Sequence, residues 1–110
     1  MIRSEICDML GIRYPVFQGG MAWIADGALA AAVSNGGGLG IIAAGNAPAD
    51  HVREQVRAAR AMTEKPIGVN IMLLSPFADE VAEVAAEERV EVVTTGAGNP
   101  SRYMKMWQEA

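Results

Sequence analysis

The sequence predicts an α/β fold in which parallel strands alternate with helices. Apolar, β-branched runs return at regular intervals, and each run is followed by a Gly-, Asn- or Pro-containing loop and then by a helix-patterned stretch. These runs occupy residues 14–18, 39–43, 67–72 and 90–95. Ligands of parallel α/β sheets bind at the C-terminal ends of the strands, so we expect functional residues in the loops after these runs.

The first two helices are predicted from spacing and end signals. Apolar residues at helical intervals predict a short leading helix over residues 3–10, which ends at Gly11 and plugs or flanks the sheet. Asp26 is a suitable N-cap for an alanine-rich helix that runs to about Ser34 and is closed by Asn35 and Gly36. Its small side chains predict a close approach to the sheet.

The remaining helices are predicted from capping residues and prolines. One begins near Pro48, is apolar on one face and charged on the other, and stops before Pro66. A cap followed by proline predicts further helix starts at Ser75-Pro76 and at Asn99-Pro100. The last helical pattern runs to Ala110 without a stop signal.

The spacing of the strands predicts part of a barrel. Strand markers at Val16, Leu39, Ile67 and Val92 are separated by 23, 28 and 25 residues, close to the roughly 30 residues per step of an eight-step barrel. Four parallel strands cannot close a barrel, and they leave two unpaired edges and an uncovered face. We therefore expect residues 1–110 to form one domain that is a half barrel of four βα units, a fragment of a larger fold.

Composition and charge exclude several classes of function. The chain is 51% hydrophobic and 20% charged, which is typical of a soluble globular domain rather than a disordered one. A net charge of −4 gives no basic surface for nucleic acid. A single cysteine and a single histidine predict neither a disulfide nor a metal site. Without a signal-peptide pattern or a membrane-length apolar run, we expect a cytoplasmic protein.

Two strand ends carry the clearest functional signals. Gly19-Gly20, after the first run, allow the backbone to pass close to a flat ligand and to present N–H groups. Asn70 is a polar amide in an otherwise apolar run, and an amide can both donate to and accept from the edge of a heteroaromatic ring. The alternative for Asn70 is a buried amide that holds a neighbouring loop.

Other strand-end motifs have a structural explanation of equal weight. Asn46 is either a ligand contact or a turn residue. The 94–100 segment combines hydroxyls and glycines with a helix start, which suits ligand contact but also a plain turn. The apolar 71–74 run either lines a tunnel for an acyl chain or packs beneath the next helix.

The glycine-rich stretch over residues 36–40 is predicted to be structural. A phosphate-binding glycine loop follows a strand and opens a helix, whereas these glycines close a helix and enter a strand. We therefore expect a helix end and a tight turn at the N-terminal face of the sheet. His51 lies in the first turn of a charged helix, which predicts a solvent-facing side chain rather than a general base.

These segments together resemble a known enzyme family over essentially the whole chain. The chain is similar to the flavin-dependent enoyl-acyl carrier protein reductases of bacterial fatty-acid synthesis, within the nitronate monooxygenase (2-nitropropane dioxygenase) family. The first two of the motifs that carry the resemblance are shared widely in that family, and the last two are typical of the reductase branch. The motifs are YPVFQGGMA at residues 14–22, GGLGII at 37–42, GVNIMLL at 68–74 and VTTGAGNP at 93–100.

The resemblance implies a TIM barrel with FMN at its C-terminal face. It also implies that NADH or NADPH is the reductant and that the substrate is a small-molecule or carrier-protein-bound enoyl thioester. The protein would position the flavin and tune it by hydrogen bonds. The residues expected around the flavin are Gly20, Met21, Ala22, Asn46, Asn70, Thr95 and Gly96.

The resemblance places the catalytic histidine and the phosphate-binding loops in the second half of such barrels. No catalytic residue is therefore expected up to Ala110, and the chain alone is expected to be inactive. Two alternatives remain at this point. One is a nitronate monooxygenase, which uses FMN and oxygen but no nicotinamide. The other is a non-catalytic half barrel that associates with itself, in line with an expected homodimer.

Overall fold

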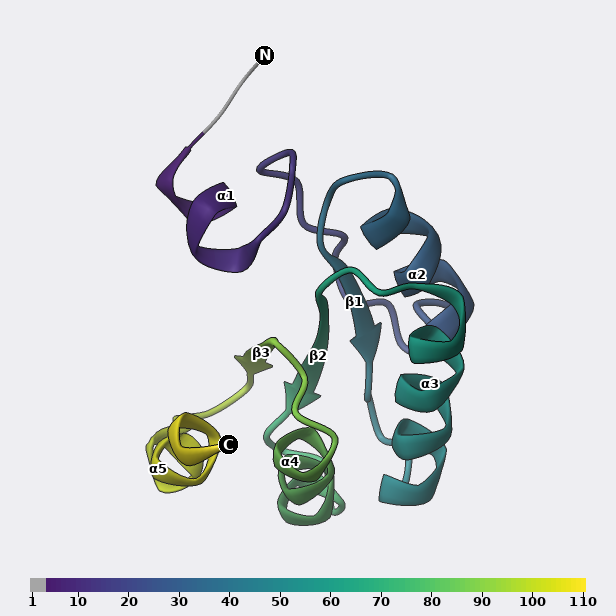
Figure 1. Cartoon of the computed structure of the whole chain (residues 1–110). Coiled ribbons are helices and arrows are strands. Elements are labelled where there is room, and N and C mark those ends of the chain that lie inside the picture. Colours follow the sequence, from purple (N-terminus) through teal and green to yellow (C-terminus); the bar gives the residue numbers. More distant parts are fainter. Residues whose placement is uncertain (1–3) are drawn as a thin grey trace.

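Helices alternate with parallel strands in the computed structural model, which describes residues 4–110 (Figure 1). The strands form one parallel sheet in the order β1-β2-β3. This confirms the predicted α/β class with helical crossovers. In chain order the elements are α1 (Glu5–Leu10), α2 (Gly27–Asn35), β1 (Gly40–Ala43), α3 (Ala49–Met62), β2 (Ile67–Met72), α4 (Ala78–Glu87), β3 (Val92–Gly96) and α5 (Ser101–Glu109).

The first predicted strand, residues 14–18, is reduced to one parallel bridge between Phe17 and Leu39. At the next position along β1, the Gln18 side chain takes the place of a strand: its Nε2 donates to the Ile41 carbonyl at 2.9 Å and its Oε1 accepts from the Ile41 N–H at 3.4 Å. The backbone after Gln18 is therefore released from the sheet. Pro15 has no N–H to extend the pairing in the other direction.

The sheet has two faces of different character because side chains alternate along each strand. Ile42, Val69 and Val93 face the helices and contribute to the main apolar core. Residues of α2 to α5 form the rest of this core, and Figure 1 shows these helices along that side of the sheet. Leu39 and Ile41 lie on the opposite face, where Cys7 of α1 packs against them. The leading helix therefore flanks the start of the sheet, as predicted, although Arg3 of that prediction lies outside the described residues.

Most of the predicted helix ends are confirmed. Gly11 ends α1 in the left-handed region at φ 70°, and the Asp26 carboxylate accepts the Leu29 N–H at 2.9 Å at the start of α2. The predicted start at Ser75 is early, because Ser75 begins a separate turn that precedes the helix. Its hydroxyl accepts from the Phe77 N–H and its carbonyl from the Ala78 N–H, so α4 begins at Ala78.

Helix α5 is fastened to α4 by aromatic side chains. The Trp107 indole N–H donates to the Ala82 carbonyl at 3.0 Å, and the Tyr103 hydroxyl donates to the Asp79 carboxylate. The Asp79 hydrogen bond, together with burial, raises the pKa of Tyr103. Both aromatic rings also contact the core, so α5 is held against α4.

An ion-pair network joins α3 to the end of α4. Arg53 and Arg57 both donate to Glu88 Oε1, at 2.8 Å and 3.1 Å. Partial burial raises the pKa of the Glu88 carboxyl, but the hydrogen bonds from the two guanidinium groups outweigh burial and hold it below the usual value. The ionised carboxylate is therefore favoured in the folded state.

We expect Glu88→Gln to lower the free energy of unfolding at pH 7 by about 0.5–1 kcal/mol, the range for exposed ion pairs. A lowered folded-state pKa adds stability above the ordinary carboxyl pKa of about 4.3 and loses it as the pH falls through the folded value. The difference between the two proteins should thus vanish in acid. Urea unfolding between pH 7 and pH 3 measures it. The control Glu83→Gln, on the exposed face of α4, should change stability by less than about 0.5 kcal/mol. A difference that is independent of pH would contradict the assignment.

Candidate functional site

The register of the sheet brings three residues into one row on the face away from the helices. Ala43 pairs with Asn70, and Asn70 pairs with Thr94. Residues two positions further along point to the same side, so Met72 and Gly96, which also pair, continue this face to the ends of the strands. The predicted polar residue, Asn70, therefore lies on the middle strand, on the face away from the helices and near the C-terminal ends of the strands.

A hollow of about 330 Å³ lies at this end of the sheet, and we call it the strand-end hollow. Among the described residues, no charged side chain lines it. Glycine and alanine supply most of the wall, and Asn70 supplies its polar side chain. Such a wall suits a flat ligand that is recognised through backbone groups and one amide. The lining residues are Gly20, Ala22, Ala43, Gly45, Asn70, Met72, Gly96 and Ala97.

The loop after the first bridge reaches the hollow because the Gln18 side chain ends the pairing with β1. Gly20 then lies against Asn70: a Cβ atom at Gly20 would come within 3.2 Å of both Cβ and Nδ2 of Asn70. Any side chain at this position would therefore press on the Asn70 amide. The absence of a side chain leaves room for the Asn70 amide beside Gly20.

Two further loops complete the wall in left-handed backbone conformations. Gly45, after β1, has φ 52°, and a Cβ atom there would come within 3.1 Å of the Ala22 side chain. Ala97, after β3, has φ 60°, which is uncommon for a residue with a side chain. The strain at Ala97 lies next to Gly96, at the edge of the strand-end hollow.

The structure brings together four of the seven residues predicted to surround a ligand. Gly20, Ala22, Asn70 and Gly96 line the strand-end hollow. The remaining three lie elsewhere. Met21 and Asn46 are exposed on the adjoining loops, and Thr95 lines a separate hollow of about 250 Å³ beside Pro100 and Met104 of the α5 region.

Strand periodicity explains the different position of Thr95. Neighbouring residues of a strand point to opposite faces, so Thr94 shares the face of Asn70 and Thr95 faces α5. Thr94 Oγ1 donates to Asn70 Oδ1 at 2.8 Å. Once the pairing of β2 with β3 is known, it shows that Thr94 and not Thr95 lies beside Asn70. The sequence motif alone does not show which of the two threonines faces Asn70.

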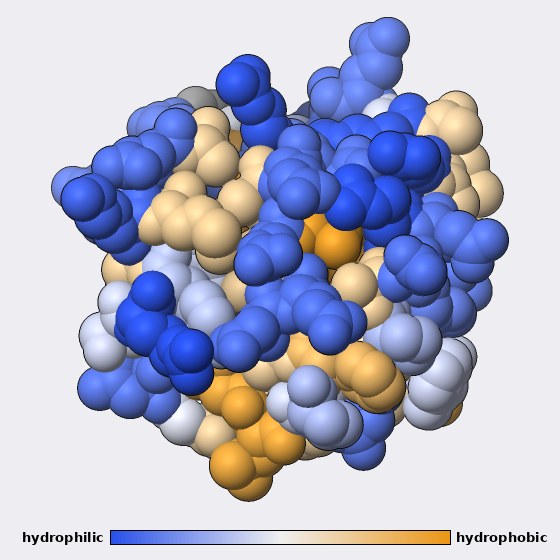
Figure 2. Space-filling model, turned by 90° about the horizontal axis from the view of Figure 1, so that it is seen from below, coloured by the Kyte–Doolittle hydropathy of each residue, from blue (hydrophilic) through white to orange (hydrophobic). Residues whose placement is uncertain are grey.

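The surface at this end of the sheet is partly apolar. Figure 2 looks onto the ends toward which the strands of Figure 1 point, and it shows orange and tan patches among polar side chains. Exposed apolar residues on these loops include Met21, Ile24 and Leu74, the last with 78% of its surface exposed. Leu73 packs against the core instead. Leu73 therefore takes the structural alternative, whereas Leu74 is exposed and its contact with an acyl chain stays a prediction.

A larger hollow, of about 530 Å³, lies at the opposite end of the sheet beside the 36–38 turn. Its glycine N–H groups are already used: Gly36 donates to Ala32 and Val33, Gly37 to Ser34, and Gly38 to Val33. No amide of this turn remains for a phosphate, which confirms that the glycines form a helix end and a tight turn. Size alone does not make this hollow a binding site.

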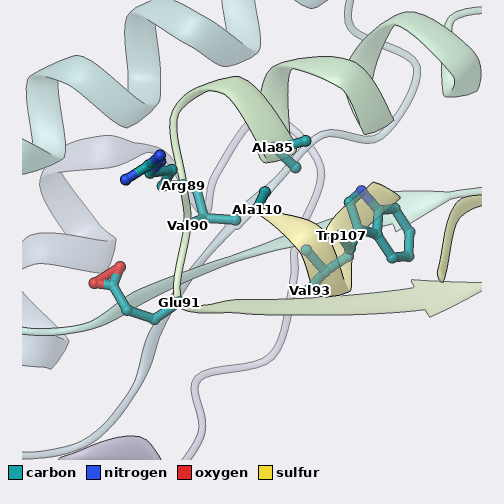
Figure 3. Close-up of a pocket in the computed structure, with 8 residues that line it drawn as sticks. Ala85, Arg89, Val90, Glu91, Val93, Trp107 and Ala110 are labelled. Atoms are coloured by element: carbon teal, nitrogen blue, oxygen red, sulfur yellow. The ribbon is translucent and has the colours of Figure 1, made fainter. Parts of the chain in front are cut away.

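A fourth hollow, of about 280 Å³, lies between the end of α4 and α5 (Figure 3). Ala85, Val90, Val93 and Trp107 form its apolar wall. One of its charged lining residues, Glu91, forms an ion pair with Arg60 of α3, with 2.8 Å between Glu91 Oε1 and the Arg60 guanidinium. This hollow lies on the helix side of β3, away from Asn70.

His51 differs from its predicted solvent-facing position. Its ring lies 5.0 Å from that of Trp23, measured between centroids, and the side chain is half-buried. It is not among the residues that line the strand-end hollow.

Within residues 4–110, no helix combines the length and apolar character needed to cross a bilayer.

Comparison with known proteins shows which family and which fold this chain is similar to. Residues 3–106 match the family described as nitronate monooxygenase. FabK from Thermotoga maritima is 48% identical with a TM-score of 0.95, over 99% of this chain and 35% of that one. The structural match places the sheet and its helices within a TIM barrel and confirms the predicted half barrel.

Curated relatives match in the same partial way. A Mycobacterium tuberculosis protein named (3aS,4S,5R,7aS)-5-hydroxy-7a-methyl-1-oxo-octahydro-1H-indene-4-carboxyl-CoA dehydrogenase is 32% identical over 99% of this chain and 31% of its own length. A nitronate monooxygenase from Pseudomonas aeruginosa is 44% identical over 62% of this chain and 19% of its own length. The chain thus spans about a third or less of the length of these relatives.

Proposed function

The chain belongs to the nitronate monooxygenase family, and from this premise we propose that it forms part of the FMN site of an enoyl-acyl carrier protein reductase. The observation that carries the proposal is the convergence of Gly20, Asn70 and Gly96 on the strand-end hollow. The likeness to FabK, at 48% identity, favours the reductase over other members of the family.

The residues of the hollow fit a flat, uncharged ring. A Cβ atom at Gly20 would crowd the Asn70 amide at 3.2 Å, and a side chain at Gly96 would extend into open space at the hollow. When bound, FMN would supply hydride transfer between a nicotinamide and the substrate. The chain would contribute glycine backbone on two sides and the Asn70 amide as a hydrogen-bond donor. We keep Met21 and Asn46, on the adjoining loops, as proposed flavin-site residues, whereas the Thr95 side chain faces α5 and is not proposed to contact a ligand in the strand-end hollow.

The proposed substrate is an enoyl thioester carried by acyl carrier protein, with NADH or NADPH as the reductant. The M. tuberculosis relative is named for a coenzyme A thioester, which supports a thioester substrate. Exposed Leu74 and the other apolar residues of the strand-end loops are suited to contact with an acyl chain.

A nitronate monooxygenase is the second candidate, because the matching family and the P. aeruginosa relative carry that name. An anaerobic assay of the FMN-loaded protein, at the full length of its relatives, separates the two. We expect NADH to remove the visible absorbance of the flavin and an enoyl thioester to restore it. No response of the flavin to nicotinamide, together with oxygen uptake on addition of a nitronate in a parallel aerobic assay, would contradict the reductase proposal.

The catalytic groups of the proposed reaction are expected outside residues 1–110. Within residues 4–110 the single imidazole, His51, lies against Trp23 rather than in the strand-end hollow. We therefore expect residues 1–110 alone to show no steady oxidation of NADH with an enoyl thioester. Robust turnover by this chain alone would contradict that part of the proposal.

Self-association is a further candidate, favoured by the open edge of the sheet. Among the described residues β3 pairs only with β2, and its apolar residues are only half-buried. An unpaired edge offers its N–H and C=O groups to another strand. We propose that two copies pair through these edges and expect a dimer in sedimentation experiments. A stable monomer at high protein concentration would contradict this assembly.

A further inference from the structure

We propose that Thr94 is a positioning residue, which holds the Asn70 amide so that its N–H donor faces the ligand in the strand-end hollow. This inference rests on the proposed function, because it assumes that the ligand there is a flavin. The hydrogen bond from Thr94 Oγ1 to Asn70 Oδ1, at 2.8 Å, is the observation from which it starts.

The position of Thr94 beside Asn70 follows from the pairing of β3 with β2. Thr94 and Asn70 are directly paired on neighbouring parallel strands, and both side chains lie on the face away from the helices. Thr94 is half-buried and is not a lining residue of the hollow. It therefore acts on a ligand through Asn70 rather than by direct contact.

The hydrogen bond determines which end of the amide is offered to a ligand. Asn70 Oδ1 is engaged by the threonine hydroxyl, whereas Nδ2 has no hydrogen-bond partner among residues 4–110. Nδ2 instead lies beside Gly20, 3.2 Å from where a Cβ atom would stand. The hollow thus presents an N–H donor, which matches a carbonyl oxygen or imine nitrogen on the edge of a heteroaromatic ring.

The hydroxyl also keeps the amide from turning over. An asparagine amide presents a donor or an acceptor according to a rotation of about 180° around its last side-chain bond. The wall near Asn70 offers glycine and alanine, which have no polar side chain to restrain it. Without the Thr94 hydroxyl, the amide would sample both orientations, and only one of them would donate to the ligand.

The test compares Thr94→Val, which keeps the shape but removes the hydroxyl, with Thr94→Ser, which keeps the hydroxyl. Thr95→Val is the matched control, because it removes the neighbouring hydroxyl on the opposite face. In the ligand-free chain, the Asn70 side-chain amide resonances should shift in Thr94→Val and remain near their original positions in Thr94→Ser and Thr95→Val. The Kd for FMN should rise about five- to tenfold in Thr94→Val alone, as expected for one lost hydrogen bond.

The two readouts separate this inference from the proposed function. If the wild-type chain fails to bind FMN, the proposed function fails, yet the amide resonances of the ligand-free chain still test the role of Thr94. If FMN binds and Thr94→Val changes neither the resonances nor the Kd, the positioning role is overturned. An equal effect of Thr95→Val would overturn it as well. Far-UV circular dichroism and thermal unfolding verify that each variant is folded.

Discussion

Gly40→Ala should lower the free energy of unfolding by about 3 kcal/mol or more, the largest effect expected of any single methyl group in this chain. Gly40 begins β1, and α2 crosses it so closely that a Cβ atom would lie 1.8 Å from the Ala30 carbonyl oxygen and 2.5 Å from its carbon. These are backbone atoms inside the core and cannot move aside as a flexible side chain does. The alanine-rich face of α2 permits this contact.

Urea unfolding followed by tryptophan fluorescence and far-UV circular dichroism measures the effect. Gly19→Ala is the matched control, because a Cβ atom there meets no atom within 4 Å. We expect this control to change stability by less than about 1 kcal/mol. Similar unfolding curves for wild type and Gly40→Ala would contradict the close packing of α2 on β1.

Gly96→Val should weaken FMN binding by at least about tenfold, equivalent to about 1.4 kcal/mol, while leaving the stability of the chain unchanged. Gly96 lines the strand-end hollow, yet a Cβ atom there meets no protein atom within 4 Å. The added side chain would therefore fill part of the proposed flavin site without disturbing the fold. A β-branched residue is also well tolerated at the end of a strand.

Fluorescence titration of FMN measures the Kd, and thermal unfolding in the absence of FMN measures the stability. Gly19→Val serves as the control, since Gly19 is a loop glycine that does not line the hollow. An unchanged Kd in Gly96→Val would place the flavin outside the strand-end hollow. A large loss of stability would show instead that Gly96 has a structural role.

The architecture could be predicted from local signals in the sequence. Strand runs 39–43, 67–72 and 90–95 correspond to β1, β2 and β3, and the caps at Asp26 and Gly11 form as expected. These features depend on a residue and its near neighbours, which periodicity and capping describe. The reduction of the first strand to one bridge was not predictable, because it depends on the Gln18 side chain reaching across to Ile41.

Only those site residues that lie in or directly after a predicted strand could be predicted from the sequence. Asn70 and Gly20 stand out in the sequence, and the structure places them side by side. Gly45 and Ala97 carry no such signal, since their role comes from loop conformation. The choice between Thr94 and Thr95 depends on the register between β2 and β3, which is a contact between residues about 24 positions apart. Sequence periodicity within one strand does not determine that register.

The central claim is that the ends of β1, β2 and β3 form a flavin site, and a nuclear magnetic resonance titration tests it most directly. The ¹⁵N-labelled chain is titrated with FMN to millimolar concentration, which detects even weak binding. We expect saturable shifts confined to backbone amides around the hollow, at Gly20, Ala22, Gly45, Gly96 and Ala97. Shifts at the 36–38 turn instead, or no shift at any concentration, would contradict the account.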